Sequence, residues 1–141
     1  MNRALFKNKA EFNKRYEAGN WEFSEFQLPG INLPERELRG ACFRRAYLAG
    51  ANFIEATLCE ADFTGANLRG AAFAESELNG VNFEGADLSG ATFHQISLKG
   101  ANLSHAQLRG AILEEVNFDN ANLSHTDFSG AVVEGETIIL D

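Results

Sequence analysis

The sequence predicts an all-β solenoid, a coil of short strands in which each turn covers the apolar face of the turn before it. Two periods predict this fold, one of five residues and one of twenty. From Ala41 to Ala101 a five-residue unit repeats without a break, with Leu or Phe at its centre and a small residue two positions earlier. An α-helix repeats its apolar face about every 3.6 residues and a strand about every 2, so a period of five indicates a short extended segment followed by a corner. A chain that turns the same way at each corner winds into a coil.

The longer period gives the number of sides. We call the central Leu or Phe position i. At position i+2, glycine recurs every twenty residues, and we call such a series of residues twenty apart a column. A second column, five residues further along, consists of glutamates with one glutamine. Four sides of five residues explain both columns, whereas a three-sided coil would place the residues of one column on different sides. The columns are Gly30, Gly50, Gly70, Gly90, Gly110 and Gly130, then Glu35, Glu55, Glu75, Gln95 and Glu115.

The repeated units also resemble a known family. Residues 51–55 (ANFIE), 61–65 (ADFTG), 66–70 (ANLRG) and 86–90 (ADLSG) are similar to the A(N/D)LXX signature of the pentapeptide repeat proteins. The resemblance covers Trp21 to Gly135, and it implies a right-handed quadrilateral parallel β-helix. The handedness comes from the resemblance alone. It implies little about function, because members of the family do different things on one scaffold.

A short capping α-helix is predicted before the coil. Asn2 is placed to cap a helix that runs to Ala18, and Gly19 is placed to end it. The first coil of a solenoid has an uncovered apolar end and unpaired strand edges, so it needs a lid. Leu5, Phe12 and Tyr16 form the apolar stripe that suits this role. We therefore predict a capping helix in residues 1–20, the β-helix in 21–135 and a tail in 136–141.

The first coil departs from the regular unit. Large residues stand where alanine is found later, as Trp21 and Phe26 do, which indicates packing against the capping helix. Arg36 occupies an inward position, two residues before Leu38. Either the register is distorted there, or the Arg36 side chain extends out of the coil towards water.

Charge and cysteine content limit the function classes. The formal net charge is −8, with +3 in residues 1–45 and −11 in residues 46–141, so contacts to nucleic acid or anionic membrane phosphates are disfavoured. No apolar run is long enough to span a membrane, and the chain is predicted to be cytoplasmic. Cys42 and Cys59 fall on different sides of the coil, so both are predicted to be free thiols.

No group of residues in the sequence predicts catalysis. His105 and His125 share a column, but no third strong metal ligand accompanies them. Ser104 and Ser124 lie in no pattern that predicts a pocket, and a catalytic nucleophile requires one. The glycines are spaced along corners and do not form a phosphate-binding loop. The sequence therefore predicts a protein that is not an enzyme and holds no metal or cofactor.

Two surface features are candidate partner-binding sites. The glutamate column stacks like charges about 5 Å apart along one corner, which is unfavourable in isolation. The corner is either a solvated edge that discourages aggregation or a surface that attracts a basic partner. On the side of the coil before the glutamate corner, the outward residues Ala72, Thr92, Ile112 and Val132 form a strip without charge. The candidate partner-binding residues are Glu35, Glu55, Glu75, Glu77, Glu115, Ile112 and Val132.

Within the family, two functions are open. One branch resembles duplex DNA in width and charge and inhibits or protects DNA gyrase or topoisomerase IV. The present chain lacks the projecting loops and the C-terminal helix of that branch, and it uses Leu as often as Phe at position i. It is more similar to the cyanobacterial and other bacterial members that include regulators. The sequence therefore favours a non-enzymatic protein–protein interaction scaffold or regulator, with the DNA-mimicking inhibitor as the alternative.

The apolar C-terminal tail leaves two arrangements open. Residues 132–141 are rich in Val, Ile and Leu and are too short for a capping helix. They either fold over the last coil or pair with a second copy, which would make a homodimer through this end.

Overall fold

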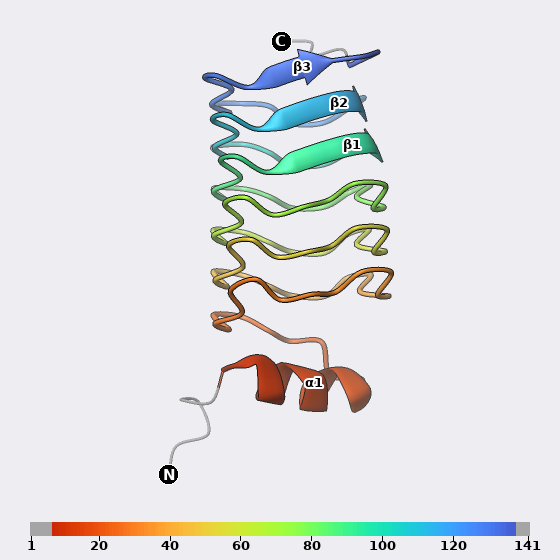
Figure 1. The fold of residues 1–141 in the computed structure, drawn as a ribbon, viewed down its shortest axis with the longest axis vertical. Helices are drawn as coiled ribbons and strands as arrows, with labels where there is room; N and C mark the ends of the chain where they lie inside the picture. Colours follow the sequence, from red (N-terminus) through yellow and green to blue (C-terminus); the bar gives the residue numbers. More distant parts are fainter. Residues whose placement is uncertain (1–6, 138–141) are drawn as a thin grey trace.

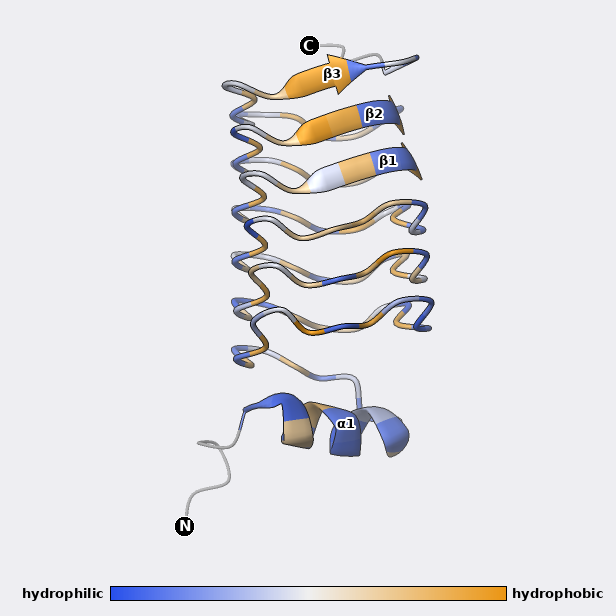
Figure 2. Ribbon diagram, viewed as in Figure 1, coloured by the Kyte–Doolittle hydropathy of each residue, from blue (hydrophilic) through white to orange (hydrophobic). Residues whose placement is uncertain are grey.

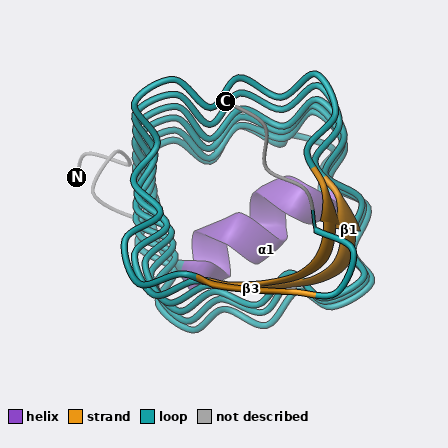
Figure 3. Cartoon of the chain, turned by 90° about the horizontal axis from the view of Figure 1, so that it is seen from above, coloured by secondary structure: helices purple, strands orange, loops and turns teal. Residues whose placement is uncertain are grey.

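The chain forms a four-sided tube with one helix lying across its N-terminal end (Figures 1 and 3). The computed structural model describes residues 7–137. The helix is α1 (Lys9–Glu17), and three parallel strands, β1 (Thr92–Ser97), β2 (Ile112–Asn117) and β3 (Val132–Glu134), form one sheet in that order. Elsewhere, neighbouring coils are joined by single parallel bridges between residues twenty apart, such as Asn52 to Ala72. The predicted period of twenty residues is confirmed.

We number the four sides in chain order by their central residues in the first coil, which are Phe23, Leu28, Leu33 and Leu38. Backbone hydrogen bonds join each side to the coil above. The amide of Phe53 donates to the carbonyl of Ala72 at 2.8 Å, and the amide of Glu55 donates to that of Ala74 at 2.9 Å. The residue at position i+2 of each corner has a positive φ, which glycine adopts at least cost. Eleven residues other than glycine adopt it as well, among them Glu55 at 60°.

Asparagine and aspartate recur at position i−1 because their side chains close the following corner. The Oδ1 atom of Asn52 accepts a hydrogen bond from the amide of Ile54 at 2.9 Å, and Oδ1 of Asp62 accepts one from the amide of Thr64 at 3.0 Å. Such Asx turns satisfy an amide that the neighbouring coil does not reach. Asn or Asp at this position therefore helps to close the corner.

Stacked phenylalanine rings fill the first and third sides of the tube. The ring centroids of Phe53 and Phe73 lie 5.4 Å apart at 10°, and those of Phe43 and Phe63 lie 5.1 Å apart at 5°. Rings of neighbouring columns meet edge to face, as Phe53 and Phe63 do at 5.7 Å and 75°. These four side chains are completely buried. The predicted inward columns are confirmed, with spacings close to one strand separation.

The corner between the third and fourth sides has two forms. Where Ala56 or Ser76 stands two residues before i, the amide of that residue donates to a phenylalanine carbonyl three residues earlier at 3.0 Å and makes a tight turn. Where Ile96 or Val116 takes this position, the strand continues through the corner, and the amide of Val116 donates to Oγ1 of Thr137 at 2.9 Å. A larger inward side chain thus accompanies the more open corner.

The prediction that the helix begins at Asn2 is wrong. Asn8 is the cap: its backbone is extended and its side chain accepts a hydrogen bond from the amide of Glu11 at 3.1 Å. Lys7 is not helical, because its carbonyl accepts a hydrogen bond from the amide of Gln27 at 2.7 Å and so pairs with the first coil. Asn2 and Leu5 themselves lie outside the described residues.

The described helix covers the first coil with aromatic side chains. Phe12 is completely buried, and its ring centroid lies 4.4 Å from that of Phe23. Tyr16 stacks on Trp21 at 5.7 Å and 9°. Arg36 keeps the repeat register, since its carbonyl accepts a hydrogen bond from the amide of Thr57, and its guanidinium lies 5.1 Å from the Tyr16 ring centroid. Of the two arrangements predicted for Arg36, the extended side chain is the one observed, held by a cation–π contact.

Candidate functional site

An unneutralised column of carboxylates lines the corner between the third and fourth sides. We call this column, Glu35, Glu55, Glu75, Gln95 and Glu115, the acidic corner. All five residues are exposed, and their φ values lie between 53° and 60°. Among residues 7–137 none of the four glutamates forms an ion pair; the nearest compensation is a 3.4 Å hydrogen bond from Nε2 of Gln95 to Oε2 of Glu115.

Two aspartates on the first and second sides form ion pairs instead. Arg44 contacts Asp62 at 3.0 Å, and Arg69 contacts Asp87 at 3.1 Å. Burial alone would raise the pKa of Asp62, but hydrogen bonds from Thr64 and from the Arg44 guanidinium hold it below the ordinary value. These ion pairs distinguish the two aspartates from the four glutamates of the acidic corner.

A strip of outward residues, exposed at Ile112 and Val132, lies on the third side and is separated from the acidic corner by the outward column that contains His94 and Glu114. We call Ala72, Thr92, Ile112 and Val132 the apolar strip. Thr92 pairs with Ile112, and Ile112 pairs with Val132, so these side chains stand one above the other on the sheet. Ile112 is 42 % exposed and Val132 is 45 % exposed. They lie in the hydrophobic parts of β2 and β3 in Figure 2.

Most of the sequence-predicted site residues are brought together. Glu35, Glu55, Glu75 and Glu115 form one column, and Ile112 and Val132 lie on the side that it borders. Glu77 is separate: it lies on the fourth side, where its Oε2 accepts a hydrogen bond from Oγ1 of Thr57 at 2.9 Å.

The sequence analysis missed two neighbours of the strip. Nδ1 of His94 lies 3.0 Å from Oε2 of Glu114, and Val133 is 46 % exposed although it occupies an inward position. The period of twenty already places His94 and Glu114 in one column, so this signal was present. The exposure of Val133 depends on its position in the last coil, which no local pattern reports.

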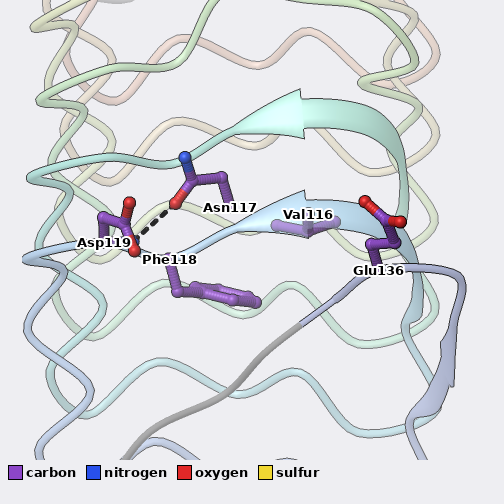
Figure 4. Close-up of a pocket in the computed structure, with 5 residues that line it drawn as sticks. All are labelled: Val116, Asn117, Phe118, Asp119 and Glu136. Atoms are coloured by element: carbon purple, nitrogen blue, oxygen red, sulfur yellow. Dashed lines mark hydrogen bonds between the residues drawn. The ribbon is translucent and has the colours of Figure 1, made fainter.

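The described residues show no arrangement typical of catalysis or metal binding. His105 and His125 stack with ring centroids 4.8 Å apart, but no group of three or more His, Cys, Asp or Glu residues within 7–137 is placed to hold a metal ion. Figure 4 shows a hollow near the C-terminal end, lined by Val116, Asn117, Phe118, Asp119 and Glu136. Oδ1 of Asn117 accepts a hydrogen bond from the amide of Asp119 at 2.8 Å, so this polar contact belongs to a repeat corner.

The cysteines and the helix agree with two further expectations. Cys42 and Cys59 are free, and Cys59 is buried. Within the described part of the chain, α1 is far too short to cross a membrane.

Comparison with known proteins identifies the family. The family model for pentapeptide repeats matches residues 37–80, 66–104, 76–114 and 96–135, with eight copies of the repeat. The chain belongs to the pentapeptide repeat family. Its fold is the right-handed quadrilateral β-helix of that family. The search of curated proteins finds no significant match.

Solved pentapeptide repeat structures are similar to this one. Rfr23 from the cyanobacterium Cyanothece 51142 is 27 % identical, with 87 % of the present chain and 97 % of that chain covered and a TM-score of 0.83. A pentapeptide repeat protein of the Arabidopsis thaliana thylakoid lumen is 28 % identical, with coverages of 79 % and 70 % and a TM-score of 0.52. QnrB1, a plasmid-mediated fluoroquinolone resistance protein, is 18 % identical, with coverages of 79 % and 76 % and a TM-score of only 0.32. The likeness to QnrB1 therefore gives no reason to assign its role to this chain.

Proposed function

We propose that this pentapeptide repeat protein is a non-enzymatic scaffold that binds another protein through the apolar strip and the acidic corner. One observation carries the proposal. Ile112 and Val132 place two large aliphatic side chains in water on a regular sheet face, where Asn32 and Asn52 stand in the same column of earlier coils. An apolar surface beside a column of uncompensated charge is typical of a protein interface.

The rigidity of the tube supports this use. Each strip residue is fixed by backbone hydrogen bonds to the coil below, such as the 2.9 Å bond from the amide of Val132 to the carbonyl of Ala111. A surface that is already ordered loses little entropy on binding. The carboxylates add long-range attraction, which raises the association rate of a basic partner and lowers it for an acidic one.

The proposal is tested by partner capture with surface variants. The full chain is immobilised, proteins of the native host are captured, and the affinity of each purified captured protein is measured in solution. We expect Ile112→Asp, and separately Glu55→Lys with Glu75→Lys, to weaken the specific interaction. Tyr47→Asp is the matched control, because Tyr47 is 38 % exposed on the second side. Unchanged affinity in both surface variants would exclude this surface.

A gyrase assay separates the scaffold from the alternative predicted by the sequence. We expect no inhibition of DNA supercoiling by gyrase at micromolar protein. Inhibition at that concentration, lost on reversal of the acidic corner, would contradict the proposal and favour the DNA-mimicking function.

Two further expectations from the sequence stay predictions. They are the cytoplasmic location and the homodimer through the C-terminal end. Analytical ultracentrifugation of the full chain decides the second, because a strict monomer at tens of micromolar would exclude it.

A further inference from the structure

The shape of the apolar strip narrows the class of partner. We infer that the strip binds an amphipathic α-helix of the partner protein, one with a single aliphatic stripe and with Lys or Arg along the flank that meets the acidic corner. This inference rests on the proposed function and specifies its occupant.

The strip is one side chain wide, which favours a helix over a flat sheet. The third side carries two outward columns in each coil. The column beside the apolar strip is polar in the upper coils, where His94 and Glu114 form a 3.0 Å contact and Glu134 follows. A second sheet packed face to face would bury these charged groups, since sheets pack through broad apolar faces. The apolar stripe of a helix is narrow enough to contact the strip alone.

The spacing along the strip also suits a helix parallel to the tube axis. Successive strip residues are one strand separation apart, about 4.8 Å, so the distance from Ala72 to Val132 is about 14 Å. One helical turn rises about 5.4 Å, and three turns rise about 16 Å. A helix of roughly ten residues therefore places one apolar side chain near each coil, with a mismatch of only about 2 Å over the whole strip.

The two borders of the strip differ in a way that orients such a helix. On one border, Gly70, Gly90, Gly110 and Gly130 present bare backbone at the corner between the second and third sides. A Cβ atom added at Gly70 or Gly110 would meet nothing within 4 Å, and other corners carry side chains at similar φ, so packing does not require glycine here. This border leaves room for a helix to lie close to the sheet. On the other side, beyond the column of His94 and Glu114, Glu115 of the acidic corner lies without a cationic partner among the described residues.

Other occupants fit less well. Strand addition does not use this face, because it pairs backbone at a strand edge and the edge of this sheet is β3; within the strip the amide of Ile112 already donates to the carbonyl of Ala91 at 2.9 Å. A second copy packed antiparallel by the same surface would bring Glu114 and Glu115 against their own equivalents, and like charges across an interface oppose association. The charge beside the strip therefore favours a basic partner over an antiparallel copy of this chain.

The inference is tested with three synthetic peptides and residue-resolved NMR. The probe is a 14-residue helical peptide of about four turns with a leucine stripe and lysines on one flank. One control peptide carries glutamates in place of the lysines, and the other carries serines in place of the leucines. The full-length, nitrogen-15-labelled protein is titrated with each. We expect the lysine-flanked peptide to give saturable shifts at the amides of Thr92, Ile112 and Val132, and both controls to bind at least about tenfold more weakly.

Matched variants separate the apolar contribution of the strip from the electrostatic contribution of the acidic corner. Ile112→Asp should abolish the shifts while Tyr47→Asp keeps them, because both residues are similarly exposed on different sides. Glu115→Lys should weaken binding more than Glu60→Lys, which makes the same change in net charge at another corner with similar φ. Equal effects within either pair would overturn the inference, as would saturable shifts confined to another side or no saturation at millimolar peptide.

The outcome is separable from that of the proposed function. A captured host protein that binds through the strip without a helix, or a dimer that Ile112→Asp dissociates, would overturn the helix inference. The strip would still be a protein-binding surface in either case. The proposed function itself fails if the surface variants leave every captured interaction unchanged, or if the gyrase assay gives the inhibition described above.

Discussion

The first and last coils of the tube use the same repeat positions but bury them to different extents. Phe23 and Leu28 in the first coil are 0 % and 1 % exposed, whereas Leu123 and Phe128, in the same columns of the last coil, are partly exposed. The first coil is packed between α1 and the second coil, as Figure 1 shows. In a solenoid, the stability contributed by a repeat therefore depends on its neighbours as much as on its own sequence.

The largest expected effect is a difference between equivalent core substitutions at the two ends. Phe23→Ala should lower the free energy of unfolding by about 3–5 kcal/mol, because it leaves a cavity in fully packed surroundings. Phe128→Ala should cost about 1–2 kcal/mol, because the ring is already partly in water. Urea denaturation of both variants measures the difference. Equal costs would show that the last coil is as tightly packed in solution as the first.

A second substitution should make the first coil resemble the last. Phe12→Ala removes the helix ring that contacts Phe23 and should cost about 3 kcal/mol, less than a substitution inside the tube because a nine-residue helix can detach locally. Hydrogen exchange should then show faster exchange at Phe23 and Leu28, with the middle coils unchanged. Uniformly faster exchange throughout the tube would mean that the helix is part of one cooperative unit.

A smaller effect is expected at the helix cap. Asn8→Ala removes the acceptor for the amide of Glu11 and should cost about 1 kcal/mol, whereas Asn8→Asp should be nearly neutral. Thermal unfolding followed by circular dichroism compares the two variants. An Asn8→Ala variant as stable as Asn8→Asp would show that the pairing of Lys7 with Gln27, rather than the cap, positions the start of α1.

The smallest expected effect depends on pH and again distinguishes an inner coil from the last. The lowered pKa of Asp62 stabilises the fold above the ordinary value of 3.8, and this contribution is lost as pH falls through the lower folded value. Asp62→Asn keeps the turn acceptor but loses the ion pair with Arg44, so its thermal midpoint should lie below that of the wild type at about pH 7. The difference should shrink as pH falls below 3.8 and through the lower folded-state pKa. Asp127→Asn in the last coil should show a smaller difference, since Arg109 lies 4.0 Å away. A difference for Asp62→Asn that persists at low pH would show that the charge is not its cause.

The features that repeat every twenty residues were predictable, because equivalent residues stack directly on one another. The Phe53–Phe73 stack, the acidic corner and the pairing of Ile112 with Val132 all follow from counting along the sequence. The open corner was not predicted, although Ile96 and Val116 stand there in place of alanine.

The features that depend on single contacts between distant residues were not predictable. Asn2 and Asn8 are equally good caps in the sequence, and the contact that decides between them is the hydrogen bond from Gln27 to Lys7, twenty residues apart. Arg36 stands at a repeat position that normally points inward, and its side chain extends instead to the aromatic ring of Tyr16. This contact depends on the docked helix, so the repeat pattern does not predict it.

The strict register of the coils has a consequence for how this molecule can change in length. An insertion of twenty residues lengthens the tube by one coil and preserves every column, because residues twenty apart pair, as Asn52 and Ala72 do. An insertion of a single pentapeptide before Ile112 would instead rotate all later residues by a quarter turn and carry the exposed isoleucine from the third side to the fourth. Because each unit keeps its own core residue, such a change rearranges the outer surface of the protein while leaving its interior chemically unaltered.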